Sequence, residues 1–264
     1  MKKLFRDLFL PACIAAALIF MMCSAYVADS IKTGVNSGRA VQVFSDNKSS
    51  GQLTLVIDPG HGGADGGAVS VTGVKESTIN LDIALKLEGI AGFFGVKTVM
   101  TRHGEDIAYP EDADTIRKMK VYDQKSRVEL INGIDYAVLL SIHQNNYSGS
   151  SAHGAQVFFK NSAGSAELAG VLQEYLEANV TGSSNREAQQ IANDIYLFKN
   201  ISCTAVMVEC GFLSNPDENC LLNNDKYRTK LALTIAAGYL NQESSLTKAY
   251  FGGTNESESS VLLY

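Results

Sequence analysis

The sequence predicts an α/β fold: a single domain built on a mostly parallel, twisted sheet with helices on both faces. One observation is that short apolar runs of strand length alternate along the chain with segments of helical periodicity. Another is that roughly 190 residues of patterned sequence remain once the two ends are set aside, which suits one hydrophobic core.

Three apolar runs, at residues 53–58, 137–142 and 205–209, have the length and β-branched content of buried parallel strands. Weaker signals predict edge-type strands at 96–101, 155–159 and 195–198.

Between these runs, apolar residues fall on one helical face in three segments, 79–91, 168–176 and 227–240. The segment 104–119 is long, charged and aperiodic, so we expect a surface insertion that borders a cleft.

The two ends of the chain differ from the patterned middle. Residues 1–29 are expected to be an export signal or an N-terminal membrane anchor, because basic residues precede an uncharged apolar run. Residues 30–51 have the composition of a flexible linker, and 243–264, rich in Ser, Glu and Asn, that of a disordered tail. The patterned domain between these ends is then 52–242. We expect the protein outside the cytoplasmic membrane, either secreted or membrane-anchored.

Composition narrows the functional classes. A formal net charge of -6 provides no basic field for a polyphosphate, so nucleic acid is not an expected partner. Outside the leader, the cysteines are Cys203, Cys210 and Cys220, an odd number that predicts no disulfide framework. Cys203 and Cys210 flank a strand and should lie too far apart to bond, while a bridge from Cys203 to Cys220 stays open.

Ionisable side chains follow the three buried strands. His61 lies in a glycine-rich turn after the first strand, His143 follows the second, and Glu209 ends the third. Open α/β sheets place ligands at the carboxyl ends of their strands. Because such groups are costly to bury without a shared polar purpose, we expect them to converge.

Two neutral imidazoles and a carboxylate form a common catalytic zinc set, which leaves a fourth position for water. Glu76 lies fifteen residues after His61, where a helix begins, and could turn its carboxylate back toward that histidine. Spacing alone leaves open which glutamate binds the metal and which serves as the catalytic base.

Four motifs, in order, resemble those of the zinc N-acetylmuramoyl-L-alanine amidases of the Amidase_3 type. They are Asp-Pro-Gly-His-Gly-Gly at 58–63, Lys-Glu at 75–76, Ser-Ile-His-Gln-Asn at 141–145 and Val-Glu-Cys-Gly-Phe-Leu-Ser-Asn at 208–215. The resemblance implies Zn²⁺ bound by His61, Glu76 and His143, with Glu209 catalytic. It also implies hydrolysis of the amide between the lactyl group of muramic acid and L-alanine in peptidoglycan.

Within that family, a lone catalytic domain behind a leader most resembles the germination-specific amidases of endospore formers. This implies a role in the spore cortex, in the formation of muramic-δ-lactam. An accessory activating protein is a further possible partner, and no sequence feature fixes the oligomeric state.

Several alternatives stay open. Cys210 could be the nucleophile of a cysteine peptidase activated by His143, and a zinc peptidase could cut within the stem peptide. A non-catalytic wall-binding module is a third alternative. We expect His103 and His153 to be loop residues with a surface role, and Arg127 to anchor a helix to the sheet through a salt bridge.

Overall fold

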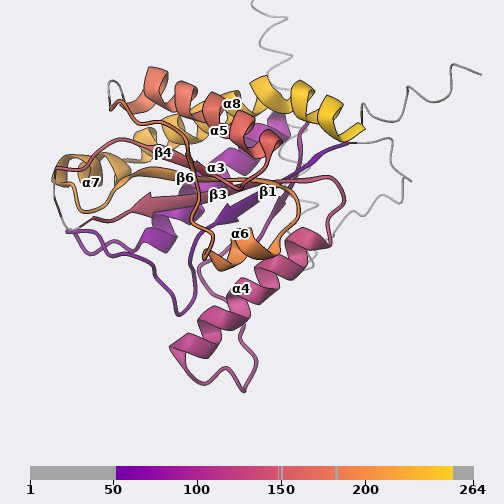
Figure 1. Cartoon of the computed structure of the whole chain (residues 1–264). Coiled ribbons are helices and arrows are strands. Elements are labelled where there is room, and N and C mark those ends of the chain that lie inside the picture. Colours follow the sequence, from indigo (N-terminus) through magenta and orange to yellow (C-terminus); the bar gives the residue numbers. More distant parts are fainter. Residues whose placement is uncertain (1–51, 148, 150, 182–183, 252–264) are drawn as a thin grey trace, which may run out of the picture. The chain divides into compact units, whose positions relative to one another are not determined.

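A six-stranded sheet forms the centre of the computed structural model, which describes residues 52–147, 149, 151–181 and 184–251 (Figure 1). The strands are β1 (Thr54–Pro59), β2 (Lys97–Met100), β3 (Ala137–Asn145), β4 (Gln156–Phe159), β5 (Gln189–Gln190) and β6 (Thr204–Phe212). Their order is β2-β1-β3-β6-β4-β5, and every pair is parallel except β4 against β6. The prediction of a mostly parallel sheet is confirmed.

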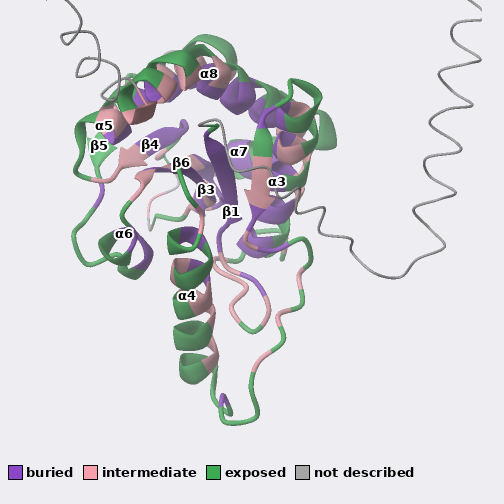
Figure 2. Cartoon of the chain, turned by 90° about the vertical axis from the view of Figure 1, so that its right-hand side faces the viewer, coloured by how far each residue is buried: buried purple, intermediate pink, exposed green. Residues whose placement is uncertain are grey.

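Helices cover both faces of the sheet, as predicted (Figures 1 and 2). They are α3 (Glu76–Phe93), α4 (Ile116–Asn132), α5 (Ala163–Leu176) with a following π-helical turn (Glu177–Thr181), α6 (Tyr196–Asn200), α7 (Pro216–Leu222) and α8 (Asp225–Phe251). Because strand side chains alternate, Leu55 and Ile57 join the core beneath α3, α5 and α8, whereas Val56 joins the core beneath α4 and α6.

Five of the six predicted strands have counterparts in the structure, and the strand predicted at 195–198 is wrong. These residues begin α6, in which the neighbours Leu197 and Phe198 are both buried in the core that also holds Ile131. Two adjacent buried side chains do not fit the alternation of a half-buried strand. A four-residue apolar run does not distinguish the two structures by periodicity.

The C-terminal helix extends further than predicted. α8 continues past residue 240 to Phe251, so the expectation that disorder begins at 243 is wrong for its first nine residues. Leu246 is buried in the core, and the Tyr250 hydroxyl donates to the Ala137 carbonyl oxygen at 3.0 Å. These contacts hold the last turns against the start of β3. Residues 252–264 lie outside the described residues.

The charged segment at 104–119, predicted as an aperiodic surface insertion, ends in the first turn of the helix that carries Arg127. α4 begins at Ile116, where the Thr115 side chain caps it by accepting from the Lys118 amide. Only Arg127 and Ile131 of this helix are buried, so most of α4 is exposed (Figure 2). The predicted leader and linker, residues 1–51, lie outside the described residues. Among the helices described, none is long and apolar enough to cross a membrane.

Candidate metal centre

His61 lies in a tight turn at the carboxyl end of β1. Pro59 ends the strand, since its nitrogen carries no hydrogen for the ladder. His61 has a φ of 60°, a left-handed conformation that is uncommon for a residue with a side chain. A Cβ at Gly60 would lie 2.2 Å from the His143 ring, so glycine is required there. The turn thereby brings the two imidazoles to a centroid separation of 5.0 Å.

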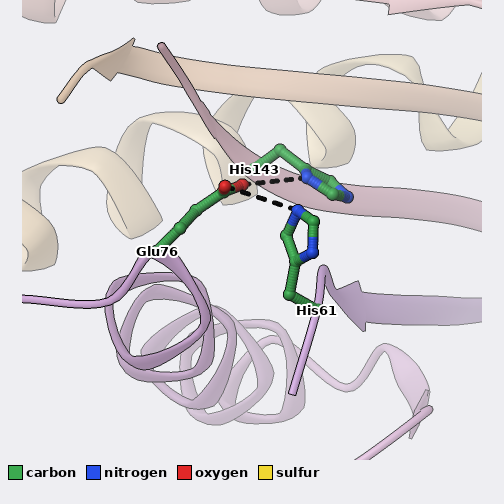
Figure 3. Close-up of side chains that lie close together, drawn as sticks. All are labelled: His61, Glu76 and His143. Atoms are coloured by element: carbon green, nitrogen blue, oxygen red, sulfur yellow. Dashed lines mark hydrogen bonds and ion pairs between the residues drawn. The ribbon is translucent and has the colours of Figure 1, made fainter. Parts of the chain in front are cut away.

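Three side chains from separate elements converge at this turn (Figure 3). Glu76, at the start of α3, places Oε2 3.3 Å from His61 Nε2 and Oε1 3.0 Å from His143 Nδ1. One ligand atom from each of the three residues lies within 4.8 Å of the other two. The structure thus brings together the three residues that the sequence analysis selected as metal ligands.

Glu76 is held as a carboxylate. Burial alone would raise its pKa, but the hydrogen bond and charge of His143, the charge of His61 and the amide of Ala68 outweigh burial and lower the pKa to about 2. An ionised oxygen donor between two imidazole nitrogens suits Zn²⁺, which is commonly bound in catalytic sites by three such protein ligands. The donor set therefore fits the metal that the sequence predicted.

Glu209 lies beside this cluster on β6, in register with His143 on β3. Its Oε2 atom is buried and has no hydrogen-bond partner among the described residues. Burial raises the pKa of this carboxyl to about 7, although the charge of His143 opposes the shift. An unpaired buried carboxylate oxygen is costly to maintain, and perturbed carboxyls of this kind mark functional sites.

Asp65 is a site residue that the sequence analysis missed. Its Oδ2 accepts from His61 Nδ1 at 3.0 Å, and its Oδ1 lies 2.9 Å from Lys120 Nζ. Burial would raise the pKa of Asp65, but the hydrogen bonds from His61 and Lys120 lower it. A carboxylate on the outer ring nitrogen leaves Nε2 of His61 free to bind a metal. The sequence did contain a signal for this role, because an aspartate lies four residues after His61, a candidate ligand.

Two buried arginines hold the turn by its carbonyl oxygens. Arg127 on α4 donates to the carbonyls of Pro59 and His61 at 2.9 and 2.6 Å, and its Nη1 lies 2.5 Å from an Asp58 oxygen. The predicted salt bridge from helix to sheet is confirmed. Arg102, which the sequence analysis did not select, donates to the carbonyls of Pro59 and Gly60 at 3.0 and 3.1 Å.

Two residues with amide side chains, Asn80 and Gln144, hold the Glu76 carboxylate in place. The Asn80 side chain donates to the Gly60 carbonyl at 3.1 Å and to Glu76 Oε1 at 3.3 Å. Gln144 donates from its backbone to Glu76 Oε1 and from its side chain to Asn80 Oδ1, both at 3.1 Å. Since these groups are buried, they restrict the carboxylate to one orientation.

The other residues considered from the sequence do not join the cluster of ligand atoms. His103 is exposed and pairs with Glu88, and His153 bonds the carbonyl of Ser151 in an exposed loop. Cys210 is fully buried, and burial raises the pKa of its thiol far above the usual range. It is therefore neither ionised nor accessible, which argues against the cysteine-peptidase alternative. All three described cysteines are free.

The fold and the site agree with a class of cell-wall hydrolases. A family model described as N-acetylmuramoyl-L-alanine amidase matches residues 55–241, most of the chain. The protein therefore belongs to this family of enzymes, which act on peptidoglycan.

Two curated relatives illustrate the match. The germination-specific N-acetylmuramoyl-L-alanine amidase of Bacillus subtilis is 34% identical over 75% of this chain and 85% of its own length. The amidase AmiA of Escherichia coli is 26% identical over 88% of this chain and 89% of its own length.

Solved structures agree with the family assignment. The CwlD amidase of Clostridioides difficile, determined in complex with the GerS lipoprotein, is 35% identical with a TM-score of 0.70, and the match covers 74% of this chain and 100% of that one. An N-acetylmuramoyl-L-alanine amidase from Clostridium difficile 630 is 31% identical with a TM-score of 0.64, over 74% and 99% of the two chains. The predicted fold and enzyme class are confirmed.

Proposed function

We propose that this enzyme is a zinc-dependent amidase in which His61, Glu76 and His143 bind the metal and Glu209 is the catalytic base. The bond cut is the amide between the lactyl group of muramic acid and L-alanine. The observation that carries the proposal is the convergence of three ligand atoms within 4.8 Å beside a buried, unpaired oxygen of Glu209.

The chain's own residues divide the work. Zinc, when bound, supplies Lewis-acid polarisation of the scissile carbonyl and acidification of water. Glu209 takes a proton from the attacking water and passes it to the leaving nitrogen of L-alanine. A pKa of about 7 suits both halves of that transfer, because the carboxyl gains and loses a proton near neutral pH. Asp65 keeps His61 oriented by accepting its other ring hydrogen.

The biological setting of the reaction belongs to the same proposal. The chain acts on spore-cortex peptidoglycan during sporulation and germination, in line with the germination-specific relative. Export by residues 1–29 delivers it to the wall. An accessory protein partner is consistent with the similar Clostridioides difficile amidase, whose structure was solved with a lipoprotein.

Digestion of purified peptidoglycan tests the reaction. The enzyme should release stem peptides that begin with L-alanine, as identified by mass spectrometry, and chelation should abolish the release. Glu209→Gln keeps the shape of the side chain but removes its basicity, so turnover should fall by at least about 100-fold. Metal content, measured by atomic emission, should stay at the wild-type level.

Each alternative gives a different result. Strong residual turnover in Glu209→Gln would remove this residue from the mechanism, and loss of metal from the same variant would make it a ligand. Cleavage within the stem peptide would point to a peptidase. Cys210→Ala is the matched control, since the buried thiol should contribute nothing to chemistry.

A further inference from the structure

The edge of the sheet opposite the metal centre has an unusual surface. Because β1, β2 and β3 are parallel, with Thr54 in register with Lys97 and with Ala137, their first residues lie together at one edge, here called the amino edge. Three large aromatic side chains at this edge are exposed: Phe93 by 83%, Phe94 by 60% and Tyr136 by 42%. The rings of Phe93 and Phe94 pack edge to face against each other, and neither ring is among the side chains that pack against the hydrophobic core.

The same edge is basic in an acidic protein. The described segments that end there are 93–97, 130–136, 160–162, 191–194, 199–203 and 248–251. They contain four lysines (Lys97, Lys160, Lys199 and Lys248) against two aspartates, Asp135 and Asp194. None of the four lysines forms an ion pair within the described part of the chain. An edge of net charge +2 thus lies on a chain of net charge -6.

Exposed aromatic rings together with unpaired lysines are the side chains that favour the interface between water and lipid headgroups. The lysines select anionic headgroups, and the rings enter the boundary between headgroup and acyl chain.

The segment that precedes β1 in the sequence indicates that a membrane lies near this edge. The predicted anchor, an uncharged apolar run over 8–28, connects through residues 30–51 to β1, and β1 begins at the amino edge. An anchor gives only one attachment, and a basic aromatic surface close to its point of entry supplies a second.

We propose that the amino edge is a lipid-binding surface, which rests on the anionic membrane that holds the anchor and directs the metal centre away from it. The inference depends on the anchor prediction but not on the identity of the metal or the base. With six residues in β1, the turn that carries His61 then lies roughly 20 Å beyond the lipid-binding surface, on the side that faces the wall.

Tryptophan fluorescence tests this orientation, because the chain contains no tryptophan. The full chain is incorporated into vesicles of phosphatidylglycerol and phosphatidylethanolamine, part of which is brominated near the glycerol. Phe94→Trp should shift its emission to the blue and lose most of its intensity to bromine. Tyr147→Trp, at an exposed position after β3 near the metal centre, is the matched control and should lose none.

A charge reversal tests the basis of the binding. Lys97, Lys199 and Lys248 changed to Glu turn the edge from +2 to -4 and should abolish the quenching of Phe94→Trp. The same change at Lys125, Lys226 and Lys230, exposed elsewhere, should leave it intact. Equal quenching of both tryptophans, no quenching of either, or equal effects of the two charge sets would overturn the proposal. A blue shift at Phe94→Trp without quenching would also overturn it, since it would indicate contact with protein.

Discussion

Asp58 organises the base of the metal centre although it binds no metal. The carboxylate is 1% exposed and pairs with Arg127 from α4, while the hydroxyls of Thr101 and Ser141 each donate to it at 2.7 Å. Four segments of the chain therefore meet at one buried charge. Arg127 continues from this charge to the carbonyl oxygens of the turn that carries His61.

Asp58 should make stability depend on pH. Burial alone raises its pKa, but Arg127 and the two hydroxyls outweigh burial, so the folded pKa lies below the unfolded value of 3.8. Its stabilisation is therefore fully present above pH 4 or so and is lost as the pH falls through the folded pKa. Asp58→Asn should cost about 3–5 kcal/mol at pH 7, because it leaves Arg127 buried without its charge partner.

Urea unfolding at pH 7 and at pH 3 measures both effects. The gap in unfolding free energy between wild type and Asp58→Asn should narrow at the lower pH. Asp135→Asn, at an exposed carboxylate, serves as the control and should change little at either pH. A gap that is constant with pH would show that the Asp58 charge contributes nothing.

Asp65 should tune the affinity for metal. Asp65→Asn keeps the side chain's size but removes the charge that orients His61, so zinc affinity should fall about 10–100-fold. Competition with a chromogenic chelator reports this affinity without any turnover. Asp106→Asn, in a nearby exposed loop, should bind zinc like the wild type. Unchanged affinity in Asp65→Asn would leave the aspartate with a structural role only.

Some residues of the metal centre could be predicted from the sequence, and others could not. His61, His143 and Glu209 were predictable because each lies at or near the carboxyl end of a buried strand, and parallel strands bring these ends to one edge. Arg102 and Asn80 were not, since they act on carbonyl oxygens of the turn and give no side-chain pattern of their own. Only the path of the backbone reveals that role.

At the scale of elements, α8 shows where composition misleads. Its last turns contain Ser, Thr, Glu and Lys, and this composition favoured the prediction of a disordered tail. A few widely spaced apolar side chains nevertheless hold these turns in the helix. Leu246 packs into the core, and Tyr250 bonds both the Ala137 carbonyl and the Thr204 amide. One buried residue per two turns was too sparse to register as a periodic pattern.

Ending the chain after Gln242 should therefore destabilise the domain. The lost burial of Leu246 and the two backbone hydrogen bonds of Tyr250 together correspond to about 3–5 kcal/mol. Thermal melts of chains that end after Gln242 and after Phe251 provide the comparison. Equal melting temperatures would show that the stable domain ends at residue 242, as the sequence predicted.

The molecule as a whole has a functional polarity that follows from parallel strands. Helix and strand alternation was enough to predict the α/β class, a parallel sheet and one catalytic edge. The order β2-β1-β3-β6-β4-β5 was beyond reach, because it depends on crossovers and on one antiparallel strand that local patterns do not encode. The proposed lipid-binding surface also required that order, since its residues are scattered from 93 to 251.

The burial of Cys210 bears on how the enzyme withstands oxidants. Peroxide and disulfides attack the thiolate, so a buried thiol with a raised pKa reacts slowly. The strand that carries the proposed base is thus protected from oxidative damage for as long as the sheet stays closed. Cys220, exposed on α7, is the more accessible thiol and meets oxidants first.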